Sequence, residues 1–98
     1  MNKKYTTAKG IRIAYLEKNP EAKNTIFFIH GNSLSANSWT KQFQSELLTS
    51  YRLVAFDLPA HGDSDASPDP DMDYTFAGLA SILTDRITHI ERKAKIGN

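Results

Sequence analysis

Two short runs of large apolar residues, each followed at once by glycine and polar residues, organise the chain. The runs cover residues 25–29 and 53–56, and the loops after them are His30-Gly31-Asn32-Ser33 and Asp57-Leu58-Pro59-Ala60-His61-Gly62-Asp63-Ser64. A continuous apolar run is typical of a parallel strand buried on both faces. Ligands of open α/β sheets bind beyond the carboxyl ends of such strands. The pattern therefore predicts two parallel strands whose loops face one crevice.

The residues before the first run predict an antiparallel hairpin at the edge of the same sheet. Segments 4–8 and 11–16 flank the turn signal Lys9-Gly10. In the second segment alternate residues are apolar, which gives the strand one firmly apolar face. Residues 17–24 are polar and contain Asn19-Pro20, which indicates a surface loop.

A helix is expected between the two apolar runs. Residues 35–38 offer several candidate N-caps, whose side-chain oxygens can accept free helix N–H groups. Trp39, Phe43 and Leu47 recur every fourth residue, with Leu48 alongside, so one stripe of the helix should face the sheet. The helix is expected to end near Ser50. Residues 51–56 then return as the second parallel strand through a right-handed crossover.

The last third of the chain predicts a loop, a helix and one more strand. Residues 66–73 contain Pro68 and Pro70 and should form a loop. From Thr75, a candidate N-cap, helical spacing to about Glu91 is kept by the apolar residues Leu79, Ile82, Leu83, Ile87 and Ile90. Residues 92–96 are expected to form the next strand, although Lys93-Ala94-Lys95-Ile96 alternates charged with small or branched residues.

The two loops, with Trp39 between them, resemble the N-terminal part of an α/β-hydrolase of the esterase, lipase, epoxide hydrolase and dehalogenase group. The resemblance runs from about Lys9 to Asn98 and implies one incomplete α/β domain over residues 1–98. Its partial α/β-hydrolase sheet would hold an N-terminal antiparallel hairpin followed by parallel strands with flanking helices. These enzymes carry their nucleophile in a G-x-S-x-G turn, with an acid and a His later in the chain. That pentapeptide is absent, although Ile96-Gly97-Asn98 resembles its beginning, so we expect a hydrolase segment that ends just before the nucleophile.

The resemblance also implies roles for the residues of the two loops. In this fold one oxyanion-hole donor is the amide after the nucleophile, and the other comes from the loop after the first buried parallel strand. By resemblance that second donor is the backbone amide of Asn32, with Ser33 as the next candidate. A tight turn without a catalytic role is the alternative. Loop-organising roles are implied for His30, Gly31, Asp57, His61, Gly62 and Ser64.

Other readings of these residues are weaker. Trp39 is expected to pack in the core and could also line a substrate pocket. His30, His61 and Asp57 suggest a metal site, but zinc needs three or four ligands in compatible geometry, so we expect neither a metal nor a cofactor. Asp57 is expected to organise its loop rather than act as nucleophile. A phosphate loop is disfavoured because no G-x-G-x-x-G occurs and no Lys-Ser or Lys-Thr pair stands where a P-loop needs one.

Composition narrows the class of protein further. The 98 residues are 40% hydrophobic with a formal net charge of +1, which is typical of a globular chain. Its basic residues are scattered, so we expect no nucleic-acid partner. The absence of Cys excludes a disulfide or a thiolate site in these residues. No apolar run follows Lys3 and Lys4 as in a signal peptide, and no stretch approaches the ~20 apolar residues of a membrane span. We therefore expect a cytoplasmic protein without a membrane partner.

Two hypotheses about function remain open. In the first, the chain belongs to a serine-type hydrolase acting on ester, amide or related bonds, and contributes the oxyanion-hole loop but no nucleophile, acid or His base. The chain alone would then be inactive, and an Asp nucleophile stays possible. In the second, it is a non-catalytic binding or assembly module derived from half a hydrolase. An open sheet edge should make it a homo-oligomer or a partner of the missing C-terminal part, and the complete enzyme would take a small-molecule substrate.

Overall fold

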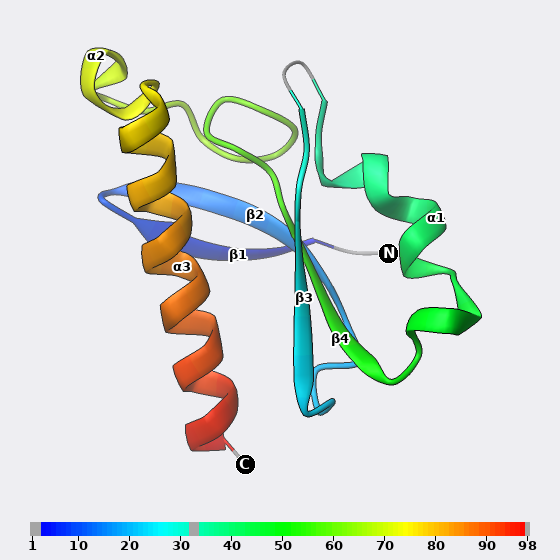
Figure 1. The fold of residues 1–98 in the computed structure, drawn as a ribbon. Helices are drawn as coiled ribbons and strands as arrows, with labels where there is room; N and C mark the ends of the chain where they lie inside the picture. The colour runs from blue at the N-terminus through cyan, green and yellow to red at the C-terminus, as the bar shows by residue number, and fades with distance from the viewer. Residues whose placement is uncertain (1–2, 32–33, 98) are drawn as a thin grey trace.

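A four-stranded mixed sheet forms the centre of the molecule (Figure 1). The computed structural model describes residues 3–31 and 34–97. Its strands are β1 (Lys4–Ala8), β2 (Ile11–Lys18), β3 (Asn24–Ile29) and β4 (Tyr51–Phe56), in the order β1-β2-β4-β3. The β1–β2 and β2–β4 pairs are antiparallel, whereas β3 and β4 are parallel, with Ile29 opposite Phe56. The predicted edge hairpin and the predicted pair of neighbouring parallel strands are both confirmed.

The hairpin turns at Lys9-Gly10, as predicted. Lys9 and Gly10 both have positive φ, 50° and 76°. Positive φ at both central residues is the mark of a two-residue turn whose twist matches that of the strands it joins. Strand β2 is longer than predicted and continues to Lys18, so the surface loop shortens to residues 19–23.

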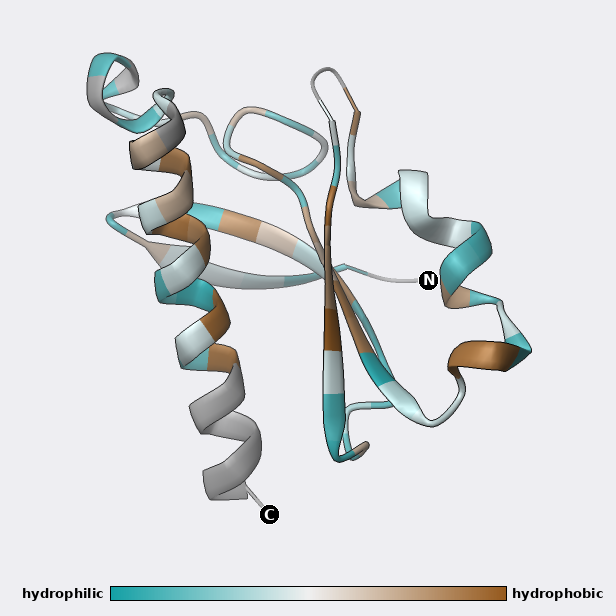
Figure 2. Ribbon diagram, in the orientation of Figure 1, coloured by the Kyte–Doolittle hydropathy of each residue, from teal (hydrophilic) through white to brown (hydrophobic). Residues whose placement is uncertain are grey.

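Helical segments cover both faces of the sheet, because side chains of a strand alternate between its two faces. Helix α3 (Phe76–Gly97) lies on one face, and α1 (Thr40–Phe43) lies on the other with the 3-10 turns η1 (Ala36–Trp39) and η2 (Glu46–Leu48) (Figure 1). In β4, Val54 and Phe56 join the core under α3, whereas Leu53 and Ala55 join the core under α1. Hydrophobic residues recur along the side of α3 turned toward the sheet (Figure 2). The predicted burial on both faces is therefore correct for the second apolar run. It is wrong for the first, because residues 25–29 lie on β3 at the end of the strand order and are only partly buried or exposed.

The single helix predicted between β3 and β4 is wrong, because this segment consists of η1, α1 and η2. Ser35 caps η1 as expected, since its hydroxyl accepts from the Asn37 amide at 3.2 Å. The apolar residues predicted to face the sheet do so as far as Phe43, which is buried, whereas Leu47 is 88% exposed. Ser45 causes the break: its backbone is extended and its hydroxyl accepts from the Leu47 amide at 3.2 Å. Such local bonds let Ser compete with helix continuation.

The last third of the chain corrects two further predictions. The predicted loop 66–73 contains one helical turn, α2 (Pro70–Asp73), which begins with proline at a position that needs no N–H donor. Thr75 caps α3 as predicted, accepting from the Gly78 amide at 3.0 Å. The strand predicted at residues 92–96 is wrong, because α3 continues to Gly97. Residues 91–95 are Glu, Arg, Lys and Ala, which are strong helix formers and supply no apolar run for a buried strand.

Helix α3 is the longest helix, with 22 residues. Charged side chains recur along it, at Asp85 and Arg86 among others. Within residues 3–31 and 34–97, no helix combines the length and the apolar character needed to cross a bilayer.

Candidate functional site

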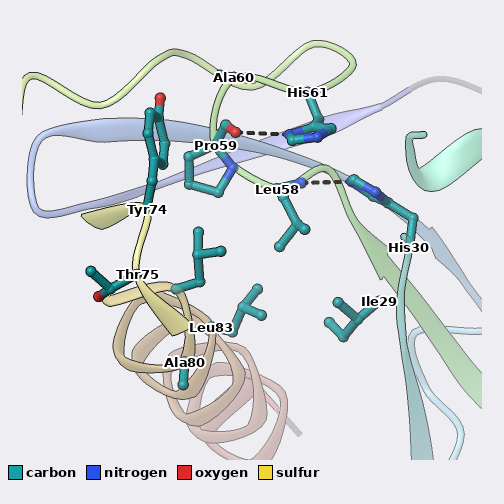
Figure 3. Close-up of a pocket in the computed structure, with 11 residues that line it drawn as sticks. Ile29, His30, Leu58, Pro59, Ala60, His61, Tyr74, Thr75, Ala80 and Leu83 are labelled. Atoms are coloured by element: carbon teal, nitrogen blue, oxygen red, sulfur yellow. Dashed lines mark hydrogen bonds between the residues drawn. The ribbon is translucent and has the colours of Figure 1, made fainter. Parts of the chain in front are cut away.

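His30 joins the loops that follow the two parallel strands. The register that places Ile29 opposite Phe56 brings the carboxyl ends of β3 and β4 together. The buried His30 ring accepts from the Leu58 amide through Nε2 at 2.9 Å (Figure 3). Its Nδ1 lies 2.6 Å from the Gly31 carbonyl oxygen. An imidazole that accepts at Nε2 and donates at Nδ1 is neutral. Both nitrogens are thus engaged in holding backbone, which leaves neither free to act as a general base.

Asp57 is fully buried at the start of the β4 loop and gathers three donors. Its Oδ1 accepts from the Ala36 amide at 2.6 Å. Its Oδ2 accepts from the Asp63 amide at 2.9 Å and from Lys3 Nζ at 2.6 Å. Burial opposes ionisation, but the Ala36 amide, the Lys3 ammonium and the Asp63 amide outweigh it and lower the pKa of Asp57. The carboxylate is therefore charged and tied to two loops and the N-terminal segment.

The β4 loop folds tightly around this carboxylate. Gly62 has φ of 51°, and a Cβ added there would lie 2.4 Å from Asp57 Oδ2. Ser64 ties the loop to the sheet, because its hydroxyl donates to the Asp57 carbonyl at 2.7 Å and accepts from the Ala14 amide at 2.8 Å. His61 Nδ1 lies 3.0 Å from the Pro59 carbonyl oxygen. The His61 and His30 ring centroids are 5.0 Å apart, so the two imidazoles stand side by side.

A largely apolar pocket of about 1050 Å³ opens between these loops and α3 (Figure 3). The two imidazoles lie on one side of it, and apolar side chains of β3, the β4 loop and α3 form most of the rest of its wall, among them Ile29, Leu58, Leu79 and Leu83. Tyr74 and Thr75 contribute from the two positions just before α3. The size and the apolar lining with a few polar groups are those of a small-molecule site.

The remaining site residues named from the sequence lie in different places. Asn32 and Ser33 lie outside the described residues. Gly31 is exposed, and a Cβ there would make only an ordinary 3.6 Å contact with Leu34. Trp39 packs against Phe28, with ring centroids 5.0 Å apart, on the sheet face that carries α1. It is not among the residues that line the pocket. In the described part of the chain, no cluster of His, Cys, Asp and Glu could hold a metal ion.

Lys3 and the Ala36 amide are two members of this arrangement that the sequence did not reveal. Lys3 is separated from Asp57 by 54 positions, and in the sequence it is one of twelve scattered basic residues. The Ala36 amide cannot be singled out from the sequence, because every residue except proline has a backbone N–H. The only available signal is indirect: an Asp directly after a buried strand needs donors to stay charged.

Comparison with known proteins fits this geometry. Residues 24–96 match the family described as the alpha/beta hydrolase fold. The chain belongs to the α/β-hydrolase fold family. The match contains β3, β4 and both loops, so the β3 loop that begins at His30 and the β4 loop that begins at Asp57 are loops of a hydrolase sheet.

Relatives of this α/β-hydrolase chain are considerably longer than it is. It is 37% identical over 83 residues to a non-heme chloroperoxidase of Streptomyces lividans, covering 84% of this chain and 30% of the relative. It is 35% identical over 79 residues to a bifunctional esterase/perhydrolase of Acinetobacter calcoaceticus, covering 80% and 29%. The solved N-acyl homoserine lactonase AidH, in complex with N-butanoyl homoserine, superposes with a TM-score of 0.84 at 31% identity, covering 93% and 33%. The chain thus spans about a third of these proteins.

Proposed function

We propose that this α/β-hydrolase chain supplies the oxyanion-stabilising loop of a serine-type hydrolase that cleaves carboxylic esters or related acyl bonds. The nucleophile, the acid and the His base would come from the part of the fold that lies beyond the matched segment in the relatives. The observation that carries the proposal is the His30–Leu58 bond at 2.9 Å, which fixes the β3 loop against the β4 loop beside the pocket. An esterase/perhydrolase and an N-acyl homoserine lactonase among the similar proteins support acyl chemistry.

The β3 loop can serve this chemistry because acyl transfer builds negative charge on the carbonyl oxygen. Backbone N–H groups held in place before the reaction stabilise that charge, and loss of one such donor typically costs ~2.7–4 kcal/mol. Resemblance to the family assigns the donor to Asn32. Around it, His30 is held by the Leu58 amide and Ala36 by the Asp57 carboxylate. A loop fixed on both sides of the donor fits an oxyanion hole better than a passive turn.

Two alternatives compete with this proposal. An Asp nucleophile would give a related hydrolase, and an epoxide hydrolase of Acinetobacter nosocomialis is among the similar structures at 25% identity. A non-catalytic binding or assembly module is the other. The largely apolar pocket beside the two imidazoles would suit a ligand of such a module as well.

A chimera tests the proposal directly. This chain would replace the matched segment of the Acinetobacter calcoaceticus esterase/perhydrolase, and kcat and KM would be measured on p-nitrophenyl acetate. We expect the chimera to hydrolyse the ester and the chain alone to show no saturable turnover. Asn32→Pro removes one backbone N–H and should lower kcat of the chimera by about 10²–10³-fold. Asn32→Ala, the matched control, keeps the N–H and should retain most of the activity.

Circular dichroism and thermal unfolding of each chimera separate lost chemistry from lost folding. A folded chimera that binds substrate but does not turn it over would overturn the proposal and favour the binding module. Equal kcat values for the proline and alanine variants would show that the Asn32 amide is not a donor.

A further inference from the structure

Consecutive residues of the β4 loop hold both ends of the segment that links β3 to η1. At one end, the Leu58 amide donates to His30 Nε2 at 2.9 Å. At the other, Asp57 Oδ1 accepts from the amide of Ala36, the first residue of η1, at 2.6 Å. The first anchor is an imidazole that accepts through Nε2. The second is a buried carboxylate, so it holds only while the charge and orientation of Asp57 are maintained.

Among the residues that the structure describes, Lys3 is the only one that donates to Asp57 through its side chain. Its Nζ lies 2.6 Å from Asp57 Oδ2 and 3.0 Å from Asp63 Oδ2, and only 9% of the Lys3 side chain is exposed. The Asp57 side chain is fully buried, whereas that of Asp63 is 59% exposed. The cation is therefore placed chiefly against the buried carboxylate. The same Oδ2 also accepts from the Asp63 amide, so Lys3 meets the Asp57 oxygen that does not bind Ala36.

We propose that Lys3 is a positioning residue that acts through Asp57: its ammonium keeps this carboxylate ionised and oriented so that Oδ1 holds the Ala36 amide. The N-terminal segment before β1 thereby fixes the start of η1 and, with His30, both ends of the β3 loop. We call the bonds that join Lys3, Asp57 and Ala36 the clamp. The effect of the clamp on catalysis rests on the proposed function of that loop. The bonds themselves do not.

The physical reason is the energy of an isolated buried charge. A carboxylate removed from water without a counter-ion either takes up a proton or turns toward solvent. A protonated carboxyl is a weaker acceptor and has its own O–H to place, so it would hold the Ala36 amide less firmly. The lowered pKa of Asp57 agrees with a carboxylate whose charge is held by its donors.

The chain offers a matched control for this clamp in the next residue. Lys4 Nζ also forms a 2.6 Å ion pair with a buried carboxylate, but its partner is Glu17 of β2 and its side chain is 56% exposed. Lys3→Met and Lys4→Met remove the same charge from neighbouring positions and keep similar aliphatic length. Only Lys3→Met should affect the site loops.

The first experiment uses NMR on the 98-residue chain itself. In Lys3→Met we expect the carboxyl pKa of Asp57 to rise, and the hydrogen exchange of the Ala36 amide to accelerate by about tenfold or more because its acceptor is weakened. Lys3→Arg should restore most of both properties. Lys4→Met should leave the Asp57 pKa unchanged and should accelerate Ala36 exchange no more than that of other core amides. An unchanged Asp57 titration together with an unchanged Ala36 exchange rate in Lys3→Met would overturn the proposal.

A double variant keeps the test decisive if Lys3→Met does not fold. Asn at position 57 keeps an acceptor oxygen for Ala36 but carries no charge that needs a cation. The Asn NH2 group takes the place of Oδ2 and cannot accept from Lys3, so Lys3→Met should no longer weaken the Ala36 bond in this background. The double variant should fold and should exchange the Ala36 amide no faster than Asp57→Asn alone. An undiminished effect of Lys3→Met in the Asp57→Asn background would contradict charge pairing.

The chimera gives the catalytic readout and separates this proposal from the proposed function. Lys3→Met should lower kcat of a folded, active chimera with little change in KM, and Lys3→Arg should recover it. If the unsubstituted chimera is inactive, the proposed function fails while the NMR experiment still decides the clamp. If the NMR result is negative and the chimera is active, the clamp fails alone.

Discussion

Ala60 and Gly62 have similar backbone conformations but only one of them has a side chain. Their φ angles are 63° and 51°, in the left-handed region that costs a residue with Cβ about 1–2 kcal/mol. At Gly62 there is also no room, because a Cβ would lie 2.4 Å from Asp57 Oδ2. That carboxylate has three donors and cannot move without losing them. Glycine is required at 62, whereas Ala60 tolerates backbone strain.

Substitutions at these two positions should therefore change stability in opposite directions. Gly62→Ala should lower the free energy of unfolding by about 3 kcal/mol, as left-handed strain adds to the displacement of Asp57. Ala60→Gly should raise it by up to about 1 kcal/mol, because relief of strain exceeds the added flexibility of the unfolded chain. Urea unfolding followed by circular dichroism measures both. Destabilisation by Ala60→Gly as large as that by Gly62→Ala would show that the φ angles do not govern the loop.

At the scale of elements, an ion network centred on Glu17 joins three strands to α3. Glu17 of β2 pairs with Lys4 of β1 at 2.6 Å and with Arg52 of β4 at 2.5 Å. Arg52 also donates to the Ile90 carbonyl of α3 at 3.5 Å. Burial alone would raise the pKa of Glu17, but its bonds to Lys4 and Arg52 outweigh burial and lower it. The charged form is therefore the one that the fold stabilises.

Glu17→Gln should lower the free energy of unfolding at neutral pH by about 3 kcal/mol, because it leaves the buried Arg52 without a counter-ion. Lys4→Met should cost less, about 1 kcal/mol, since the Lys4 side chain is mostly exposed. The folded-state pKa of Glu17 lies below the ordinary value of 4.5, so the Glu17 contribution to stability is present above pH 4.5 and is lost as pH falls through the folded-state pKa. Urea midpoints from pH 7 down to about pH 3 should accordingly converge for wild type and Glu17→Gln. A constant difference over that range would contradict the assigned pKa direction.

The elements that could be predicted from the sequence are those with local signals. Lys9-Gly10 closes the hairpin, and Thr75 starts α3, because turn and cap chemistry acts within a few residues. The helix break at Ser45 was missed because the spacing of Trp39, Phe43 and Leu47 favours one continuous helix, while the competing bond is a single hydroxyl. The strand expected at residues 92–96 is wrong because these residues supply no continuous apolar run, and their helix propensity prevails.

For the candidate site too, the sequence predicts some features and not others. The two loops could be placed at neighbouring strand ends from the apolar runs alone. Their connections could not, since the His30–Leu58 and Lys3–Asp57 contacts join residues 28 and 54 positions apart. Such contacts depend on strand order and register, which no local pattern encodes.

At the scale of the whole molecule, β3 leaves one edge of the sheet open. In the described part of the chain β3 pairs only with β4, and it is the last strand in the order β1-β2-β4-β3. Its residues 26–29 are Ile, Phe, Phe and Ile, none of them buried, and Ile29 is 40% exposed. An edge without charge or proline presents free N–H and C=O groups together with apolar side chains, which favours pairing with another strand.

We therefore expect the isolated chain to self-associate through β3. Size-exclusion chromatography with light scattering over a wide range of concentration should give a mass above the 11.0 kDa of the monomer. Ile29→Lys places a charge on the open edge and should shift the chain toward monomer, because a buried lysine would oppose strand pairing. Leu47→Lys adds the same charge at a residue of η2 that is 88% exposed, so it should leave the mass unchanged. A monomeric wild type at the highest concentration would contradict the expectation, and an equal effect of both lysines would place the association elsewhere on the surface.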